Sequence, residues 1–309
     1  MFSFFANIFG YLLNLIYELV NNYGIAIILF TLLIKIVMLP LSIKQQKMLK
    51  KSAKLQEKLK VIQFKYKNNP DKLNQEMMNL YKEEKMNPFS GCLSTIIQFI
   101  LLISIFYMVR SPLTYMKKID TNTINSYVQQ MKDEGKTVSA AYPEIDIIRE
   151  ANFLKEKNPE DQTINNLSLN MNFLGLDLSK IPQANLTDWT VYIIPILYII
   201  SSFISIKMTT NMQSKLTKKD EVIDITEPEK ENKKSKEPEN QLLSLEEKKQ
   251  EEEYDAMAQT NKMMSWMMPI MSVSISIIAP LGLALYWLVN NILMILERLI
   301  LNKIIKDED

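Results

Sequence analysis

The sequence predicts an all-α integral membrane protein with five transmembrane helices, a cytoplasmic antiparallel helical hairpin and an N-terminal interfacial amphipathic helix. Three observations predict this fold. Several apolar segments reach the length of about 20 residues that a helix needs to cross a hydrocarbon core of about 30 Å. The charged segments between them carry lysine unevenly, although 36 basic residues nearly balance 35 acidic ones over the 309-residue chain. Within some charged segments, apolar residues recur every three or four positions, as on one face of a helix.

The composition argues against an enzyme. The chain has no histidine and a single cysteine, Cys92. It therefore lacks the commonest general base, and it has no internal disulfide and no plausible set of His and Cys ligands for zinc. The sequence also lacks a glycine-rich phosphate loop and a nucleophile elbow. We expect no catalytic residues, no cofactor, no metal site and no specific nucleic-acid site.

Residues 1–22 predict an amphipathic helix. Small and polar residues recur there at spacings of three or four, and apolar residues fill the other side; the recurring residues are Ser3, Asn7, Gly10, Asn14 and Glu18. A helix of this kind lies in the membrane interface more readily than it crosses the bilayer. A transmembrane helix stays the alternative because the polar face is narrow.

Residues 23–43 predict the first transmembrane helix, an apolar run interrupted by Lys35 and by Pro40 near its end. The following segment, 44–90, has twelve lysines against five acidic residues, which places it in the cytoplasm by the positive-inside rule. Its apolar residues keep a helical spacing on both sides of Asn68-Asn69-Pro70. We therefore expect two antiparallel helices with a break at this point.

Two interpretations of the predicted hairpin stay open. Either it only buries its own seam, or it is a docking arm whose lysines contact lipid headgroups or an acidic partner. The candidate docking residues are Lys44, Lys47, Lys51, Lys54 and Lys58.

Four further transmembrane helices are predicted, at 91–110, 189–207, 263–279 and 283–301. The last two are separated only by Pro280-Leu281-Gly282, so they form a tight antiparallel pair with its turn outside. Because each span reverses the direction of the chain, the N-terminus is expected outside and the C-terminus in the cytoplasm.

The remaining segments are polar. Residues 111–188 carry eight basic and eleven acidic residues and are predicted to be extracytoplasmic. Residues 208–262 form a charged cytoplasmic linker, and 302–309 a cytoplasmic tail. Within the linker, 208–255 has fourteen acidic residues, nine lysines and almost no aromatic residues. Such a segment buries too little apolar surface to offset its ordering entropy, so we expect it to be largely disordered.

Lys35 is the main functional candidate, because it lies deep inside the first predicted transmembrane helix. It is eleven residues from Gly24 at the outer end of its span and nine from Lys44, or about 13 Å from the cytoplasmic end at 1.5 Å per residue. A lysine side chain spans roughly half of that distance, so snorkelling alone should not hydrate the ammonium group. A cation at the helix centre costs about 2.5 to 3.5 kcal/mol on insertion scales.

We expect a hydrated cavity around the Lys35 ammonium. Glu297 is the one acidic residue inside any predicted span, and it lies close to a cytoplasmic end. We therefore expect no ion pair at mid-depth, and a cavity or a thinned inner leaflet must hydrate Lys35. Polar residues of other predicted spans are candidates to line the cavity, although serine and threonine more often pack helices together. The candidates are Thr31, one turn before Lys35 on the same helix, and, on the other spans, Thr95, Gln98, Ser201, Ser202, Ser205, Asn290 and Asn291.

Several long stretches resemble the YidC and Oxa-type membrane protein insertases, in particular the shorter Gram-positive type of YidC. They are YGIAIILFTLLIKIVMLPLSIKQQKM (23–48), EMMNLYKEEKMNPFSGCLSTIIQFILLISIFYMVR (76–110), FLGLDLS (173–179), MMPIM (267–271) and PLGLALYWLVNN (280–291). The resemblance implies five core helices around a hydrophilic groove with a positive residue on the first. That residue maps onto Lys35, where the family usually has arginine, and Trp287 falls where relatives place an aromatic residue on the last helix.

The resemblance also implies a function. It implies an insertase and chaperone of the bacterial plasma membrane that inserts newly made membrane proteins, alone or with the Sec translocon. The implied partners are nascent membrane proteins, the ribosome, the Sec translocon and the lipid bilayer. The alternative is a secondary transporter or channel in which Lys35 binds an anionic solute. The sequence shows no inverted repeat of the kind that many transporters have.

Overall fold

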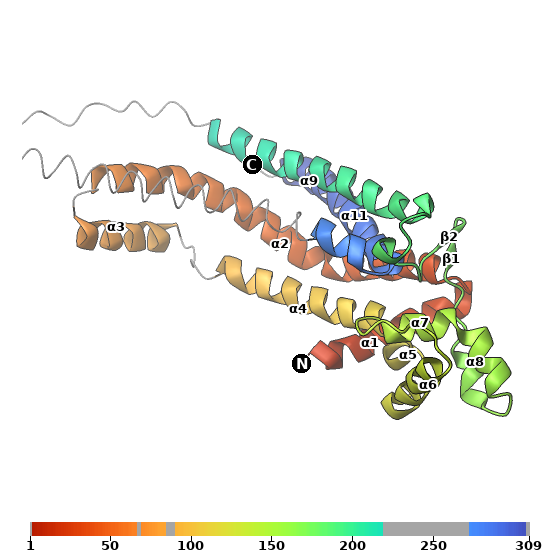
Figure 1. The fold of residues 1–309 in the computed structure, drawn as a ribbon. Helices are drawn as coiled ribbons and strands as arrows, with labels where there is room; N and C mark the ends of the chain where they lie inside the picture. The colour runs from red at the N-terminus through yellow and green to blue at the C-terminus, as the bar shows by residue number, and fades with distance from the viewer. Residues whose placement is uncertain (1, 67–68, 85–89, 219–271, 307–309) are drawn as a thin grey trace, which may run out of the picture. The chain divides into compact units, whose positions relative to one another are not determined.

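The computed structural model describes residues 2–66, 69–84, 90–218 and 272–306, and it is mostly helical (Figure 1). The chain divides into two compact units. One comprises Met1–Lys47, Phe89–Ile206 and Val273–Asp309, and the other comprises Met48–Pro88 and Lys207–Ser272. The candidate site lies within the first unit.

Four helical segments are long and apolar enough to cross a membrane: Phe2–Val20, Tyr23–Met48, Trp189–Asn211 and Leu281–Ile304. Three of them coincide with predicted spans, and the first is the helix for which we expected an interfacial position. The predicted span at 91–110 corresponds to helix α4 (Ser90–Arg110), of which Ile96–Arg110 is a shorter apolar stretch. The predicted span at 263–279 lies mostly outside the described residues. A count of five spans therefore stays a prediction.

Helix α1 (Phe2–Val20) packs against α4 and the short helix α5 (Pro112–Tyr115). Its buried residues follow helical spacing: Ala6, Phe9, Gly10, Leu13 and Tyr17. Its polar residues bind the segment after α5, because Lys117 Nζ lies 2.6 Å from Glu18 Oε1 and Lys118 Nζ lies 2.7 Å from Asn7 Oδ1. The predicted helix is thus present, and its orientation to the membrane stays a prediction.

Helix α2 (Tyr23–Lys65) is 43 residues long and continues through Pro40, so the predicted boundary between 43 and 44 is not a helix end. The helix ends before the predicted break, and α3 (Pro70–Glu83) begins after it. The Asn69 side chain caps α3 by accepting a hydrogen bond from the Lys72 N–H at 3.0 Å. In the second unit, Leu55 of α2 and Leu80 of α3 are buried.

The segment 111–188 is folded, although its polar composition predicted no secondary structure. After α5 come three α-helices: α6 (Thr121–Asp133), α7 (Pro143–Arg149) and α8 (Ala151–Lys157). A 3-10 helix, η1 (Gln162–Asn166), is followed by a small antiparallel hairpin of β1 (Asn172–Phe173) and β2 (Leu176–Asp177), and then by a second 3-10 helix, η2 (Pro182–Ala184). Met131, Ile147, Leu154 and Leu167 are completely buried in this segment. It therefore has an apolar core of its own.

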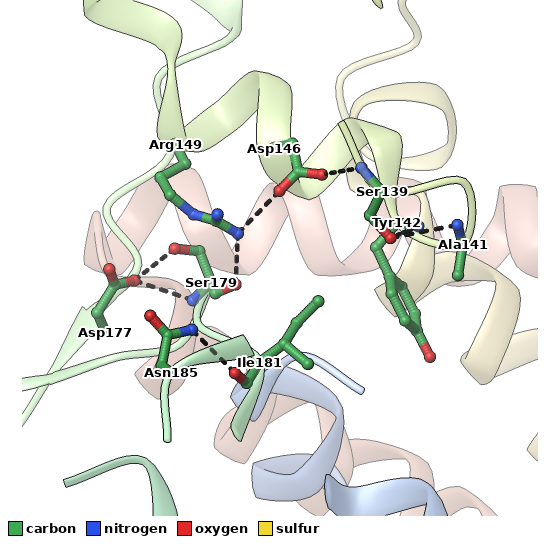
Figure 2. A network of polar contacts seen from close by, with 9 residues as sticks. All are labelled: Ser139, Ala141, Tyr142, Asp146, Arg149, Asp177, Ser179, Ile181 and Asn185. Atoms are coloured by element: carbon green, nitrogen blue, oxygen red, sulfur yellow. Dashed lines mark hydrogen bonds and ion pairs between the residues drawn. The ribbon is translucent and has the colours of Figure 1, made fainter. Parts of the chain in front are cut away.

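A polar network ties α7 to β2 and to the turn that follows it (Figure 2). The buried Asp146 carboxylate lies 2.9 Å from Arg149 Nη2 and accepts a hydrogen bond from the Ser139 N–H at 2.7 Å. Arg149 Nη2 in turn donates to the Ser179 carbonyl at 3.2 Å. The Ser179 N–H and hydroxyl both donate to Asp177 Oδ1. The network satisfies the buried acid.

The same segment holds the N-terminal ends of α2 and α11 (Leu281–Lys306) together. The Tyr23 N–H donates to the Asn170 carbonyl, and the N–H groups of Leu281 and Gly282 donate to the carbonyls of Lys180 and Leu178, all at 2.9 Å. A Cβ atom on Gly282 would lie 3.3 Å from Tyr23 Cε1, so the two helix ends are in contact. Helices α2 and α11 therefore start at the same level and run in the same direction.

Candidate functional site

The Lys35 ammonium forms an ion pair with the Glu297 carboxylate. Lys35 Nζ lies 3.3 Å from Glu297 Oε2, and the two side chains are only 22% and 13% exposed. The expectation that no ion pair is available to Lys35 is therefore wrong. The charge predicted to require a hydrated cavity has an acidic partner on the last helix.

Helix geometry explains why the sequence argument missed this partner. Lys35 lies eleven residues from Gly24, and Glu297 lies fifteen from Gly282. At 1.5 Å per residue these separations correspond to depths of about 17 Å and about 23 Å, so the two Cα levels differ by about 6 Å. Side chains of a helix tilt toward its N-terminus, which brings the Glu297 carboxylate toward the level of Lys35. The flexible four-carbon stem of lysine covers the remaining distance.

Helix α9 (Ile193–Lys218) contributes a second polar contact to α11. The buried Asn291 amide donates to the hydroxyl oxygens of Ser201 and Ser202, at 2.9 Å and 3.3 Å. One helical turn further along α9, Ser205 Oγ lies 3.5 Å from Arg298 Nη1. The predicted residues Ser201 and Ser202 are thus joined by Asn291, whereas the neighbouring candidate Asn290 is only half-buried.

Two polar stripes on α11 organise these contacts. Asn291 and Arg298 are seven residues apart, which is two helical turns, and both bind serines of α9. Asn290 and Glu297 have the same spacing, and Glu297 faces Lys35 of α2. Asn290 therefore lies on the stripe that faces α2, two turns before Glu297. The candidate Asn291 is thus confirmed as a polar contact of α11, and the seven-residue spacing is the signal that could have added Glu297 and Arg298 to the candidates.

The other predicted residues make contacts of their own, except Thr95, whose side chain lies outside the described residues. The buried Thr31 hydroxyl donates to the Ile27 carbonyl of its own helix at 2.6 Å, which is a packing arrangement. The Trp287 ring is half-buried, with its centroid 6.1 Å from that of Tyr198. Gln98 is exposed and donates to Gln45 Oε1 at 2.8 Å, which links α4 to α2.

The five candidate docking lysines have different surroundings. Lys58 Nζ lies 2.5 Å from Glu84 Oε1, and Lys51 donates to the Glu84 carbonyl, so both bind the C-terminal end of α3. Lys44 and Lys47 are exposed, and the Lys54 side chain lies outside the described residues. In the parts of the chain that the structure describes, no group of three or more Asp, Glu or Cys side chains could hold a metal ion.

Comparison with known proteins supplies the remaining finding. The model of the 60Kd inner membrane protein family matches residues 15–228 and 239–308. Proteins named "Membrane protein insertase YidC" from Francisella tularensis subsp. novicida (strain U112), subsp. tularensis (strain WY96-3418) and subsp. holarctica (strain LVS) are each 45% identical to this chain over 109 residues. Those residues are 35% of this chain and 20% of each relative, so the alignment spans about a fifth of the relatives' length.

Proposed function

The chain belongs to the 60Kd inner membrane protein family, and from that premise we propose that it inserts newly made membrane proteins into the bacterial plasma membrane and helps them fold. The resemblance to the YidC and Oxa-type insertases is confirmed at the level of the family. The observation that carries the proposal is Lys35, a cation eleven residues inside the most apolar helix, within reach of polar side chains of α11. A purely structural span has little use for such a residue.

The proposed mechanism needs no covalent step, and the chain is proposed not to be an enzyme. A client's polar flank loses hydration when it enters the bilayer, which is the main barrier to insertion. Side chains of α2, α9 and α11 would offer this flank charged and hydrogen-bonding partners at mid-depth. Transfer of the client's apolar span into lipid would drive the reaction, since Leu, Ile, Phe and Val each favour insertion by about 0.3 to 0.6 kcal/mol at the helix centre.

We infer the topology and the partners of the proposed insertase from the distribution of lysine along the chain. The N-terminus is proposed outside and the C-terminus in the cytoplasm, with the lysine-rich segment 44–90 on the cytoplasmic side. There the exposed Lys44 and Lys47 would receive clients from the ribosome or the Sec translocon. Lys51 and Lys58, which contact Glu84 at the end of α3, would help to hold the two helices of the hairpin together.

The anion transporter or channel is the weaker candidate. The sequence shows no inverted repeat of the kind that many transporters have. Growth rescue of a bacterium depleted of its own insertase separates the two functions. We expect the wild type and Lys35→Arg to restore growth, and Lys35→Glu to fail at equal membrane level. Lys132→Glu, the same charge reversal at an exposed position of α6, is the matched control. Failure of a well-expressed wild type would contradict the insertase and favour the transporter or channel.

A further inference from the structure

The ion pair between Lys35 and Glu297 points to a role for Glu297 that the insertase proposal does not contain. We propose that Glu297 is the resting counter-ion of Lys35, and that an acidic group in a client's flank displaces it. Glu297 would then be a specificity-determining residue: it sets how acidic a flank must be to reach Lys35. This inference rests on the proposed insertase function.

The geometry of the pair leaves room for a competing carboxylate. Lys35 Nζ has three N–H donors, and its contact with Glu297 is to a single oxygen, Oε2. The other oxygen, Oε1, is buried without a hydrogen-bond partner among the described residues. The pair therefore lacks the bidentate geometry that makes arginine–carboxylate pairs strong. A contact through one carboxylate oxygen to a lysine is one that a second acceptor can replace.

Exchanging Glu297 for a client's carboxylate at Lys35 avoids burying an additional unpaired charge. Removing water from an ion pair costs about as much as the attraction returns, so a buried pair is weakly stabilising overall. Replacing one carboxylate by another at the same ammonium leaves the number of paired charges at that site unchanged. The released Glu297 lies six residues from Lys303 and nine from Lys306, close to the end of α11. It is therefore better placed than Lys35 to regain water when its partner is taken.

The exchange predicts a preference among clients. A client whose translocated flank carries Asp or Glu competes with Glu297 for Lys35, whereas a flank with Asn or Gln offers no charge. Without Glu297, Lys35 would be available at all times, and acidic clients would gain most. A role for Glu297 in helix packing alone predicts no such difference between the two kinds of client.

A chemical crosslink tests whether the pair exists and whether a client opens it. Dicyclohexylcarbodiimide joins a carboxylate and an amine in contact as an amide, and the reagent leaves as the urea. With the full chain in vesicles of phosphatidylethanolamine and phosphatidylglycerol, we expect a Lys35–Glu297 linked peptide by mass spectrometry, which Glu297→Gln abolishes. A single-span client with two Asp residues in its flank should lower the yield, and its Asn counterpart should not. No linked peptide in the absence of client, or a yield that both clients change equally, would overturn the inference.

Insertion of the same two clients into these vesicles tests the consequence. We expect Glu297→Gln to speed insertion of the Asp client about fivefold relative to the Asn client, a difference of about 1 kcal/mol. The effect should vanish when Lys35→Gln is added. Glu18→Gln, which removes the acid from another Lys–Glu pair, is the matched control. Equal effects of Glu297→Gln on both clients would refute the counter-ion role and leave the insertase standing, whereas a wild type that inserts neither client would refute the insertase itself.

Discussion

Lys35 and Glu297 stabilise each other in a part of the chain where either charge alone is expensive. A lone cation at a helix centre costs about 2.5 to 3.5 kcal/mol on insertion scales. The contact at 3.3 Å offsets part of this cost for both residues, although neither is fully buried. Removing one partner leaves an unpaired charge, and removing both leaves none. The losses of stability from the two single substitutions should therefore not add. The double substitution should cost less stability than the sum of the two single ones.

We predict that Glu297→Leu lowers the stability of the chain by about 1 to 3 kcal/mol, because a partly buried ammonium loses its partner. The double variant Lys35→Met with Glu297→Leu should return close to wild-type stability while losing insertase activity. Thermal unfolding of the purified chain in detergent measures the first effect, and growth rescue the second. A double variant less stable than Glu297→Leu alone would contradict the pairing.

Glu144, like Asp146, is a buried acid outside the membrane-spanning segments. Its carboxylate accepts hydrogen bonds from the Thr114 N–H at 3.0 Å and from the Thr114 hydroxyl at 2.6 Å, at the N-terminal turn of α5. Burial raises the pKa of Glu144, and the Thr114 hydrogen bonds oppose this effect without cancelling it. The folded chain thus holds the proton more tightly than the unfolded chain does.

The sign of the resulting pH dependence follows from linkage. Because the pKa is raised on folding, the contribution of Glu144 to stability is greatest below the unfolded pKa of about 4.3 and declines as pH rises through the folded value. Glu144→Gln cannot titrate, so its Tm relative to the wild type should rise as pH increases from 4 toward neutrality. Scanning fluorimetry of both chains provides the comparison. A constant difference in Tm would show that Glu144 has the same pKa in both states.

At the level of single elements, close approach of backbones fixes where α1 packs. A Cβ atom on Gly10 would lie 2.1 Å from the Tyr115 carbonyl oxygen, which is closer than any real contact. The obstacle is backbone, so it cannot rotate away as a side chain would. At Gly282 the nearest atom is the end of the Tyr23 side chain at 3.3 Å, where a small movement suffices.

Gly10→Ala should therefore separate α1 from α5 and destabilise the chain by about 1 to 3 kcal/mol, the usual range for overpacking. This loss should exceed the gain in helix propensity of about 1 kcal/mol that alanine brings. Gly282→Ala, the matched control, should change stability much less. Limited proteolysis after Val20, with Tm as a second reading, measures both. Equal tolerance of the two alanines would show that α1 does not pack on α5 through Gly10.

For the molecule as a whole, periodicity predicted the helices better than it predicted their contacts. Hydropathy placed α2, α9 and α11, and the Asn69-Pro70 break was correct because capping and proline act locally. The ion pair of Lys35 was missed because its partner is 262 residues away, and sequence distance says nothing of spatial distance. The fold of 111–188 was missed in part because α7 and α8 have only seven residues each, although α6 has buried residues at helical spacing, Ile124, Tyr127 and Met131, which the sequence could have revealed.

The most direct test of the insertase places a photo-crosslinking amino acid on α11 in living cells. Asn290 shares the stripe of Glu297 that faces α2, whereas Ile292, two residues away, is 43% exposed on another face. A ribosome-bound nascent chain with one transmembrane segment should crosslink strongly from position 290 and weakly from position 292. Equal crosslinking from both positions, or none from position 290 in a chain that reaches the membrane, would contradict the account.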